Sequence, residues 1–249
     1  MTIFGELHAQ WYDRWHEGKD YPREVEQLRG IIEAYGSGRD LIDLGCGTGR
    51  HLELLAAEGY RVVGVDRSAV MVAQAQARLA PYEASVVQAE PAAPPFGEAF
   101  DLATMMFSAI GYQVTDEAMA AALAAVHRVL RPGGLFLFDV LDAAAILRDG
   151  PQGEVTLVRD GDERLLRATT GAVHRDDETY EFTVRLWLLR DEKVIEHAEE
   201  SHVLRFFLRR ELDLLLSTHG FALLGQAPLA GGRSGSARTW SRLVWARRI

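Results

Sequence analysis

The strongest structural signal in this chain is the segment Leu41-Ile42-Asp43-Leu44-Gly45-Cys46-Gly47-Thr48-Gly49. A short apolar run ends in a carboxylate, and three alternate glycines follow before a helical pattern over 48–58. Glycine reaches positive φ and has no Cβ, so the backbone of such a turn can lie directly against a ligand. The segment therefore predicts a strand, a ligand-binding turn and a helix.

A second apolar run, Arg61-Val62-Val63-Gly64-Val65-Asp66, also ends in a carboxylate. An acid at the end of the second strand suits the two hydroxyls of a ribose. The dinucleotide fingerprint wants a small residue at position 50, where this chain has Arg50, and the phosphate loop wants Gly-Lys-Ser/Thr. We therefore expect an adenosine-like ligand without a phosphate cradle, with Asp43 suited to an ammonium group.

Strand and helix patterns alternate between residues 40 and 140, after two helical segments at 6–17 and 22–35. Strands are expected at 40–44, 61–65, 84–88, 100–105 and 134–140, with helices at 48–58, 68–79 and 115–130. This alternation predicts an α/β fold with a doubly wound, mostly parallel, seven-stranded sheet. Its last two strands are expected at 221–226 and 239–247, after a helix at 209–219.

Residues 154–206 have a different pattern, with β-rich runs separated by Asp/Gly turns. This pattern predicts a small antiparallel β-sheet inserted into the parallel fold. We assign residues 1–142 and 207–249 to a Rossmann-like domain with an N-terminal helical lid. Residues 143–206 are then an inserted sheet that caps the acceptor site.

The motif Asp43–Gly49, together with Asp66, resembles class I S-adenosylmethionine-dependent methyltransferases. Arg131-Pro132-Gly133-Gly134 and the run 100–106 match later motifs of the same family. The segment 106–112 and the inserted sheet resemble a small-molecule branch that includes aminosugar N,N-dimethyltransferases. The resemblance implies methyl transfer from S-adenosylmethionine to a small molecule, an amine such as an aminosugar or a hydroxyl, by in-line displacement that leaves S-adenosylhomocysteine.

The resemblance also implies roles for individual residues. In that branch an N-terminal tyrosine closes over the cofactor, and the position of Tyr112 faces the acceptor. Glu90 stands where the family usually has an aspartate for the adenine amino group, and Pro91 after it has no N–H. The expected cofactor-binding residues are Tyr12, Tyr21, Asp43, Gly45, Gly47, Gly49, Asp66, Arg67, Met71, Ala89, Glu90, Met106 and Phe107. On the acceptor side we expect Tyr112, His202 and Arg205.

The composition limits the other classes of function. The net charge of −9 lacks the positive footprint typical of nucleic-acid binding. The histidines do not show the spacing of a metal site, and we expect no metal. Without a bilayer-spanning run or a secretory start at residues 1–6, we expect a cytoplasmic protein that does not bind membranes. A homodimer is left open.

Three alternatives to a small-molecule methyltransferase follow from the same residues. The chain could be a binding module that retains the cofactor fold without turnover, or a methyltransferase acting on protein or RNA. An NAD-dependent oxidoreductase is disfavoured by Arg50, because the bulk of this side chain obstructs the approach of a pyrophosphate.

Overall fold

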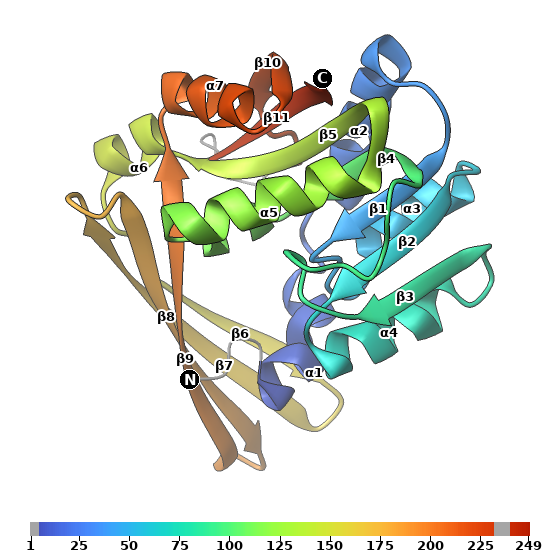
Figure 1. The fold of residues 1–249 in the computed structure, drawn as a ribbon. Helices are drawn as coiled ribbons and strands as arrows, with labels where there is room; N and C mark the ends of the chain where they lie inside the picture. The colour runs from blue at the N-terminus through green and yellow to red at the C-terminus, as the bar shows by residue number, and fades with distance from the viewer. Residues whose placement is uncertain (1–4, 232–239) are drawn as a thin grey trace.

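The computed structural model describes residues 5–231 and 240–249. Its central sheet has five parallel strands followed by a closing pair, of which the inner strand runs antiparallel to the rest (Figure 1). In spatial order they are β3 (Ala84–Gln88), β2 (Arg61–Asp66), β1 (Asp40–Leu44), β4 (Phe100–Met105), β5 (Leu130–Asp142), β11 (Ser241–Arg248) and β10 (Phe221–Pro228). The predicted seven-stranded, mostly parallel sheet is confirmed.

The strand order reverses at β1, which pairs in parallel with β2 on one side and β4 on the other. The connections of β1 and β2 turn one way along the sheet, and the later strands build the other half. Ligands of open α/β sheets bind at such a reversal, beyond the carboxyl ends of the strands. The glycine turn follows β1 directly, so the topology places it in this crevice.

Helices cover both faces of the central sheet. On one face α2 (Tyr21–Tyr35), α3 (Arg50–Ala57) and α4 (Ala69–Leu79) bury Leu28, Leu52 and Ala75 in one core cluster. On the other face, α5 (Asp116–Val129) and α7 (Arg209–Thr218) form a second cluster around Phe136 and Phe138. No helix in the described residues has the length and apolarity needed to cross a bilayer.

The antiparallel strands form a layer that extends from the end of β5 (Figure 1). They are β6 (Glu154–Asp160), β7 (Glu163–His174), β8 (Thr179–Arg190) and β9 (Lys193–Phe207), each paired with the next. The end of β9 pairs in parallel with Leu141 and Asp142 of β5. Because hydrogen bonding continues from one layer into the other, the division of the chain at residues 143 and 206 stays a prediction.

One helix was not expected from the sequence. Residues 143–149 form α6 (Ala143–Asp149), and the side chain of Asp142 accepts a hydrogen bond from the Ala144 N–H at 2.9 Å. A carboxylate in this position satisfies one of the free N–H groups of the first turn. The helix has only seven residues, which is too short for a clear helical period in the sequence.

The first helix, α1 (Glu6–Trp15), joins the two layers. One side of α1 packs Leu7, Trp11 and Trp15 against buried side chains of β7 and β8. Its other side packs Ala9 and Tyr12 against Met71 of α4. Figure 1 shows α1 between the antiparallel strands and α4. The helix is therefore placed as a lid beside the crevice at the end of β1.

Candidate active site

The glycine turn presents open backbone to the crevice. Gly45, Gly47 and Gly49 all have positive φ, at 94°, 54° and 78°. A Cβ built on Gly47 would meet none of the described atoms within 4 Å, whereas one on Gly49 would lie 3.2 Å from Ala75 Cβ. Gly47 therefore leaves room for a ligand at the main chain, and Gly49 allows α3 and α4 to pack closely.

Asp66 is fixed against the glycine turn by two backbone hydrogen bonds. Its Oδ2 accepts from the Gly47 N–H at 2.9 Å, and its Oδ1 accepts from the Ser68 N–H at 2.9 Å. Burial raises the pKa of this carboxyl group, and the two backbone hydrogen bonds oppose that shift. Each oxygen keeps further acceptor capacity. The arrangement fits a carboxylate that receives the hydroxyls of a ribose.

Asp43 is a fully buried carboxylate next to the same turn. Thr104 Oγ1 donates a hydrogen bond to Asp43 Oδ1 at 2.7 Å. Burial raises the pKa of Asp43 to about 6, against the opposing effects of His51 and the Thr104 hydrogen bond. A carboxylate taken out of water is stabilised by a cationic partner. The ammonium group of S-adenosylmethionine has the charge that this position favours.

A cavity of about 30 Å³ lies between Asp43, the glycine turn and the side chains of Tyr12 and Tyr21. This volume holds about one or two water molecules. A nucleoside needs more room than this, so we expect the tyrosines, which lie over the turn, to move outward when it binds. Burial keeps the pKa of Tyr12 and of Tyr21 well above the ordinary value, so both hydroxyls are neutral.

Asp13 holds the lid in this position. It accepts hydrogen bonds from Thr48 Oγ1 at 2.7 Å and Arg50 Nε at 3.3 Å, and it also pairs with Arg78. Burial opposes ionisation of Asp13, but the hydrogen bonds from Arg78 and Thr48 outweigh it and lower the pKa. One carboxylate thus ties α1 to the glycine turn and to α4.

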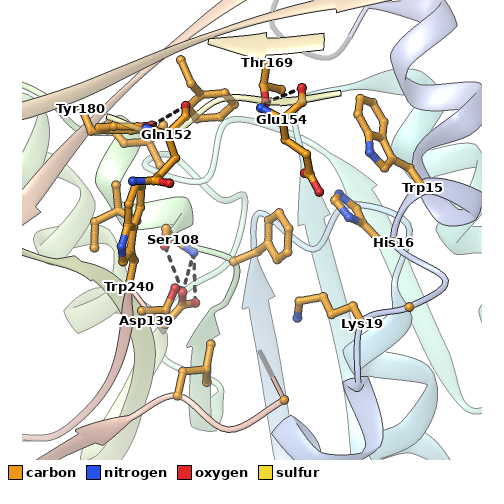
Figure 2. Close-up of a pocket in the computed structure, with 18 of the residues that line it drawn as sticks. Trp15, His16, Lys19, Ser108, Asp139, Gln152, Glu154, Thr169, Tyr180 and Trp240 are labelled. Carbon is orange, nitrogen blue, oxygen red and sulfur yellow. Dashed lines mark hydrogen bonds between the residues drawn. The ribbon is translucent and has the colours of Figure 1, made fainter. Parts of the chain in front are cut away.

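A second cavity, of about 420 Å³, lies beside the first, and its wall contains several aromatic side chains (Figure 2). In Figure 2, Trp240 and Tyr180 line one side and Trp15 and His16 the other, with Glu154 and Thr169 of the antiparallel strands between them. Phe107 lines both cavities. A group bound at the glycine turn would therefore face a ligand in the larger cavity.

Phe107 is placed by a strained turn that the sequence did not reveal. Phe107 and Ser108 both have left-handed backbone, with φ of 64° and 55°, which costs energy in residues other than glycine. The buried carboxylate of Asp139 accepts hydrogen bonds from the Ser108 N–H and hydroxyl, each at 3.0 Å (Figure 2). The detectable signal was a single carboxylate inside the apolar run 135–140.

Tyr112, on the 3₁₀ turn Ala109–Tyr112, lines the larger cavity, and His202 of β9 lies behind it. The Tyr112 hydroxyl is 2.8 Å from His202 Nδ1, and His202 Nε2 is 3.2 Å from Glu200 Oε2. The same Glu200 oxygen is 2.7 Å from His8 Nδ1 of α1. The structure thus puts Tyr112 at the cavity, whereas His202 reaches the cavity only through Tyr112.

Glu200, His8 and His202 are also a group whose metal-ligating atoms lie within 4.8 Å of one another. Ligands held tetrahedrally at about 2.0–2.2 Å from zinc are spaced about 3.3 Å or more apart. The 2.7 Å between His8 Nδ1 and Glu200 Oε2 is the distance of a hydrogen bond. We therefore interpret the group as a hydrogen-bonded network.

Arg205 does not lie where we expected it. Its guanidinium pairs with Asp116 at 2.6 Å and with Glu211 at 2.8 Å, at the first turns of α5 and α7. Side chains alternate between the two faces of a strand, so Arg205 points away from the neighbouring Leu204, which lines the larger cavity. The structure gives Arg205 a role in joining β9 to two helices in place of the acceptor contact.

The other expected residues divide into two groups. Seven of them line the small cavity: Tyr12, Tyr21, Asp43, Gly45, Gly47, Met106 and Phe107. Arg67 and Glu90 are exposed, and Ala89 packs against the core while its N–H donates to the Asp66 carbonyl. Met71 packs under Tyr12. The expected adenine position of Glu90 therefore stays a prediction.

The known proteins that this chain resembles are methyltransferases. Residues 41–134 match a family described as a methyltransferase domain. The chain is 27% identical over 231 residues to the dTDP-3-amino-3,4,6-trideoxy-α-D-glucopyranose N,N-dimethyltransferase of Streptomyces venezuelae, covering 92% of this chain and 94% of that one. It is 28% identical to the dTDP-3-amino-3,6-dideoxy-α-D-glucopyranose N,N-dimethyltransferase of Streptomyces fradiae, covering 93% and 88%.

Among solved structures, the sugar N-methyltransferase KedS8 from Streptoalloteichus superimposes with a TM-score of 0.80 at 23% identity, covering 100% of this chain and 95% of that one. A methyltransferase from Clostridium acetobutylicum gives 0.78 at 18% identity, covering 97% of each chain. At these identities the likeness shows the fold. Together with the matched domain and the full-length relatives, it makes this chain similar to class I S-adenosylmethionine-dependent methyltransferases. Within that class it resembles the aminosugar N,N-dimethyltransferases, as the sequence predicted.

Proposed function

We propose that this enzyme transfers the methyl group of S-adenosylmethionine to the amine of a small molecule, specifically an aminosugar. The main support for this proposal is the 420 Å³ cavity, which shares Phe107 with the cavity at the glycine turn. Small-molecule sites typically have volumes of about 300–1,000 Å³ and mostly apolar walls. The names of the two relatives that cover most of this chain support an aminosugar acceptor.

The lining of the larger cavity suits a sugar. Trp15, Tyr180, Phe182 and Trp240 supply flat apolar surfaces for the C–H faces of a ring. Gln152, Glu154 and Thr169 supply amide, carboxylate and hydroxyl groups for its hydroxyls. An acceptor held on these surfaces directs its amine toward Tyr112 and toward Phe107, which lines both cavities.

In this proposal the cofactor supplies a methyl group made electrophilic by a sulfonium. Asp43 pairs with its ammonium group, Asp66 receives the ribose hydroxyls, and the Gly47 main chain lies against the nucleoside. Tyr12 and Tyr21 cover the bound cofactor and exclude water from it. What the protein contributes is alignment of the amine lone pair with the methyl carbon, and correct orientation is worth about 7–11 kcal/mol in favourable systems.

The test is a methyl-transfer assay with matched acceptors. Nucleotide-linked hexoses carrying a free amine, an N-acetylated amine or a hydroxyl at the same carbon are each incubated with enzyme and S-adenosylmethionine. The proposal expects one and then two methyl groups on the free amine, stoichiometric S-adenosylhomocysteine, and no product from the acetylated sugar, whose nitrogen lone pair is delocalised. Methyl transfer only to added protein or RNA, or cofactor binding without turnover of any acceptor, would contradict it.

A further inference from the structure

A buried network of hydrogen-bonded side chains lies behind Tyr112, and alignment of the substrates alone does not explain it. Tyr112 Oη, His202 Nδ1 and Nε2, and Glu200 Oε2 follow one another at 2.8 and 3.2 Å. Glu200 Oε2 is also 2.7 Å from His8 Nδ1. The other oxygen, Oε1, accepts a hydrogen bond from the Gly5 N–H at 2.7 Å. His8, Glu200 and His202 are all at most 5% exposed. Burying a carboxylate and two imidazoles costs free energy unless these groups form hydrogen bonds with one another.

The hydrogen bonds fix the direction in which this network is polarised. Burial opposes ionisation of Glu200, but the hydrogen bonds from His202 and His8 outweigh it and hold the pKa of its carboxyl group well below the usual value. An ionised carboxylate only accepts hydrogen bonds, so His202 Nε2 and His8 Nδ1 both donate to it. With its proton on Nε2, the His202 imidazole can accept a hydrogen bond at Nδ1. The Tyr112 hydroxyl therefore donates to Nδ1.

We infer that Tyr112, His202 and Glu200 form a proton relay that takes a proton from the acceptor's ammonium group, with His8 positioning Glu200. This inference rests on the proposed amine methylation. An alkylamine has a pKa of about 10 and is protonated at neutral pH, so its nitrogen has no lone pair to attack with. Each transfer also forms a C–N bond from that lone pair and leaves the S–C pair on sulfur, so the product nitrogen keeps a proton that must leave before a second transfer.

The relay balances these protons. The ammonium N–H passes its proton to Tyr112 Oη while the Tyr112 hydroxyl proton passes to His202 Nδ1. Tyr112 is never a free phenolate, in accord with its pKa, which burial raises well above the ordinary value. The resulting imidazolium lies against the Glu200 carboxylate, as the histidine of a hydrolase triad lies against its aspartate. The proton returns to water when the cavity opens.

The side chains around His202 are compatible with a positive charge on its imidazole. The ring of Phe182 stacks on His202 with centroids 4.7 Å apart and an interplanar angle of 2°, which fixes the imidazole plane. Two arginines also act electrostatically on the network: Arg167 of β7 lowers the pKa of His8, and Arg67 opposes the rise in the pKa of Tyr112. Burial lowers the pKa of His8, so His8 stays neutral and Glu200 carries the compensating charge.

The test compares two acceptors of the same shape, one a sugar amine and the other the corresponding alkoxyamine, which is already neutral at pH 7. His202→Gln and Glu200→Gln are expected to lower kcat for the amine about 10²–10⁴-fold at pH 7, with little change in KM. Their kcat for the amine should rise about tenfold per pH unit over a range in which wild type is flat. With the alkoxyamine both variants should stay close to wild type.

His174→Gln is the matched control, since His174 pairs with Glu181 at 3.1 Å on the exposed part of the same antiparallel strands. It should leave kcat for both acceptors unchanged. An equal loss for both acceptors in the His202 and Glu200 variants would mean a structural role and would overturn the relay. So would an unchanged kcat for both.

Nitrogen NMR of the imidazoles in the free enzyme provides a readout that does not depend on turnover. The relay requires a proton on Nε2 of His202 and none on Nδ1, and Tyr112→Phe should shift the Nδ1 resonance selectively. A proton on Nδ1 would overturn the relay. Wild-type enzyme that shows the expected tautomer but methylates neither acceptor would contradict the proposed function instead.

Discussion

Asp43 shows at the scale of one residue how a binding site reduces stability. Its carboxyl group is buried among Thr104, the glycine turn and two tyrosines, and burial raises its pKa to about 6. At neutral pH the free protein therefore contains an ionised carboxylate that is buried away from water. A cationic group of the cofactor relieves that cost, which is one way in which a site favours its ligand.

Asp43→Asn is expected to stabilise the free enzyme at pH 8. The pKa in the folded state lies above the unfolded value of about 3.9, so the folded state holds more protons between about pH 4 and 6 and loses stability as pH rises through that range. Against wild type, the free energy of unfolding of the variant should gain up to about 3 kcal/mol between pH 4 and pH 8. Urea denaturation across this range measures it, and calorimetry should show weaker S-adenosylmethionine binding. Parallel pH profiles would contradict the prediction.

Gly47 and Gly133 form a matched pair for testing contact with the main chain. Both have positive φ, at 54° and 78°, and a Cβ on either would meet none of the described atoms within 4 Å. Gly47→Ala and Gly133→Ala should each cost about 1–2 kcal/mol of stability. Only Gly47→Ala should lower S-adenosylmethionine affinity, by tenfold or more, because its methyl group enters the ligand space. Calorimetry that shows equal affinity in both variants would remove the Gly47 main chain from the binding site.

At the scale of the elements, α1 is the part of the site that has to move. It places Tyr12 over the glycine turn and Trp15 in the wall of the larger cavity. Asp13 fastens it to Thr48, Arg50 and Arg78, and Arg14 forms an exposed pair with Asp160 of β6 at 2.7 Å. The first of these contacts closes the lid on the cofactor site, while the second lies on the surface.

Asp13→Asn should loosen the lid. The loss of charge-assisted hydrogen bonds is expected to cost about 1.5–3 kcal/mol and to speed dissociation of S-adenosylhomocysteine. Stopped-flow fluorescence of Trp11 and Trp15 reports that rate. Because the pKa of Asp13 is lowered in the folded state, its contribution is present above the unfolded pKa of about 3.9 and is lost as pH falls below it.

The control for this variant is Arg14→Gln on the same helix. Exposed ion pairs contribute about 0–1 kcal/mol, so this variant should dissociate product at nearly the wild-type rate. If Arg14→Gln changes the rate as much as Asp13→Asn does, the position of α1 depends on general contacts with the antiparallel strands and the link through Asp13 has no special role.

At the scale of the whole molecule, the proposed cofactor site lies where the two layers and α1 meet. Leu7 and Trp11 of α1 pack on the antiparallel strands, and Ala9 and Tyr12 pack on α4 of the central fold. A ligand that holds the lid closed therefore stabilises contacts in both layers. Binding energy at this junction should appear as stability of the entire chain.

S-Adenosylhomocysteine at about 100 times its Kd should add about 2.7 kcal/mol and raise Tm by roughly 5–11 °C. Asp66→Ala should weaken binding by about 1.5–3 kcal/mol and abolish most of this shift at the same concentration. Differential scanning calorimetry measures both, and hydrogen exchange should show protection gained in α1. An undiminished shift in Asp66→Ala would exclude the ribose role of this carboxylate, and an equal shift with NADH would contradict the choice of cofactor.

Much of this organisation is local in the sequence. The strands that end in Asp43 and Asp66, the glycine turn and the cap of α4 by Ser68 follow from short-range patterns, and the structure has all of them. They are predictable because hydrophobic period and turn chemistry act over a few residues. α6 was missed because it is short, and the turn at Phe107 and Ser108 was missed because its hydrogen-bond acceptor, Asp139, is 31 residues away.

The sequence by itself therefore determined the doubly wound fold, the glycine turn after β1 and the likeness to methyltransferases. Tertiary structure decided which side chains face the acceptor. Arg205 and His202 are three residues apart on one strand, yet the alternation of the strand directs His202 to Tyr112 and Arg205 to helices α5 and α7. Tyr112 lies 90 residues from His202, and Asp116 lies 89 residues from Arg205. No local pattern encodes these two contacts, because only packing of the two layers brings those segments together.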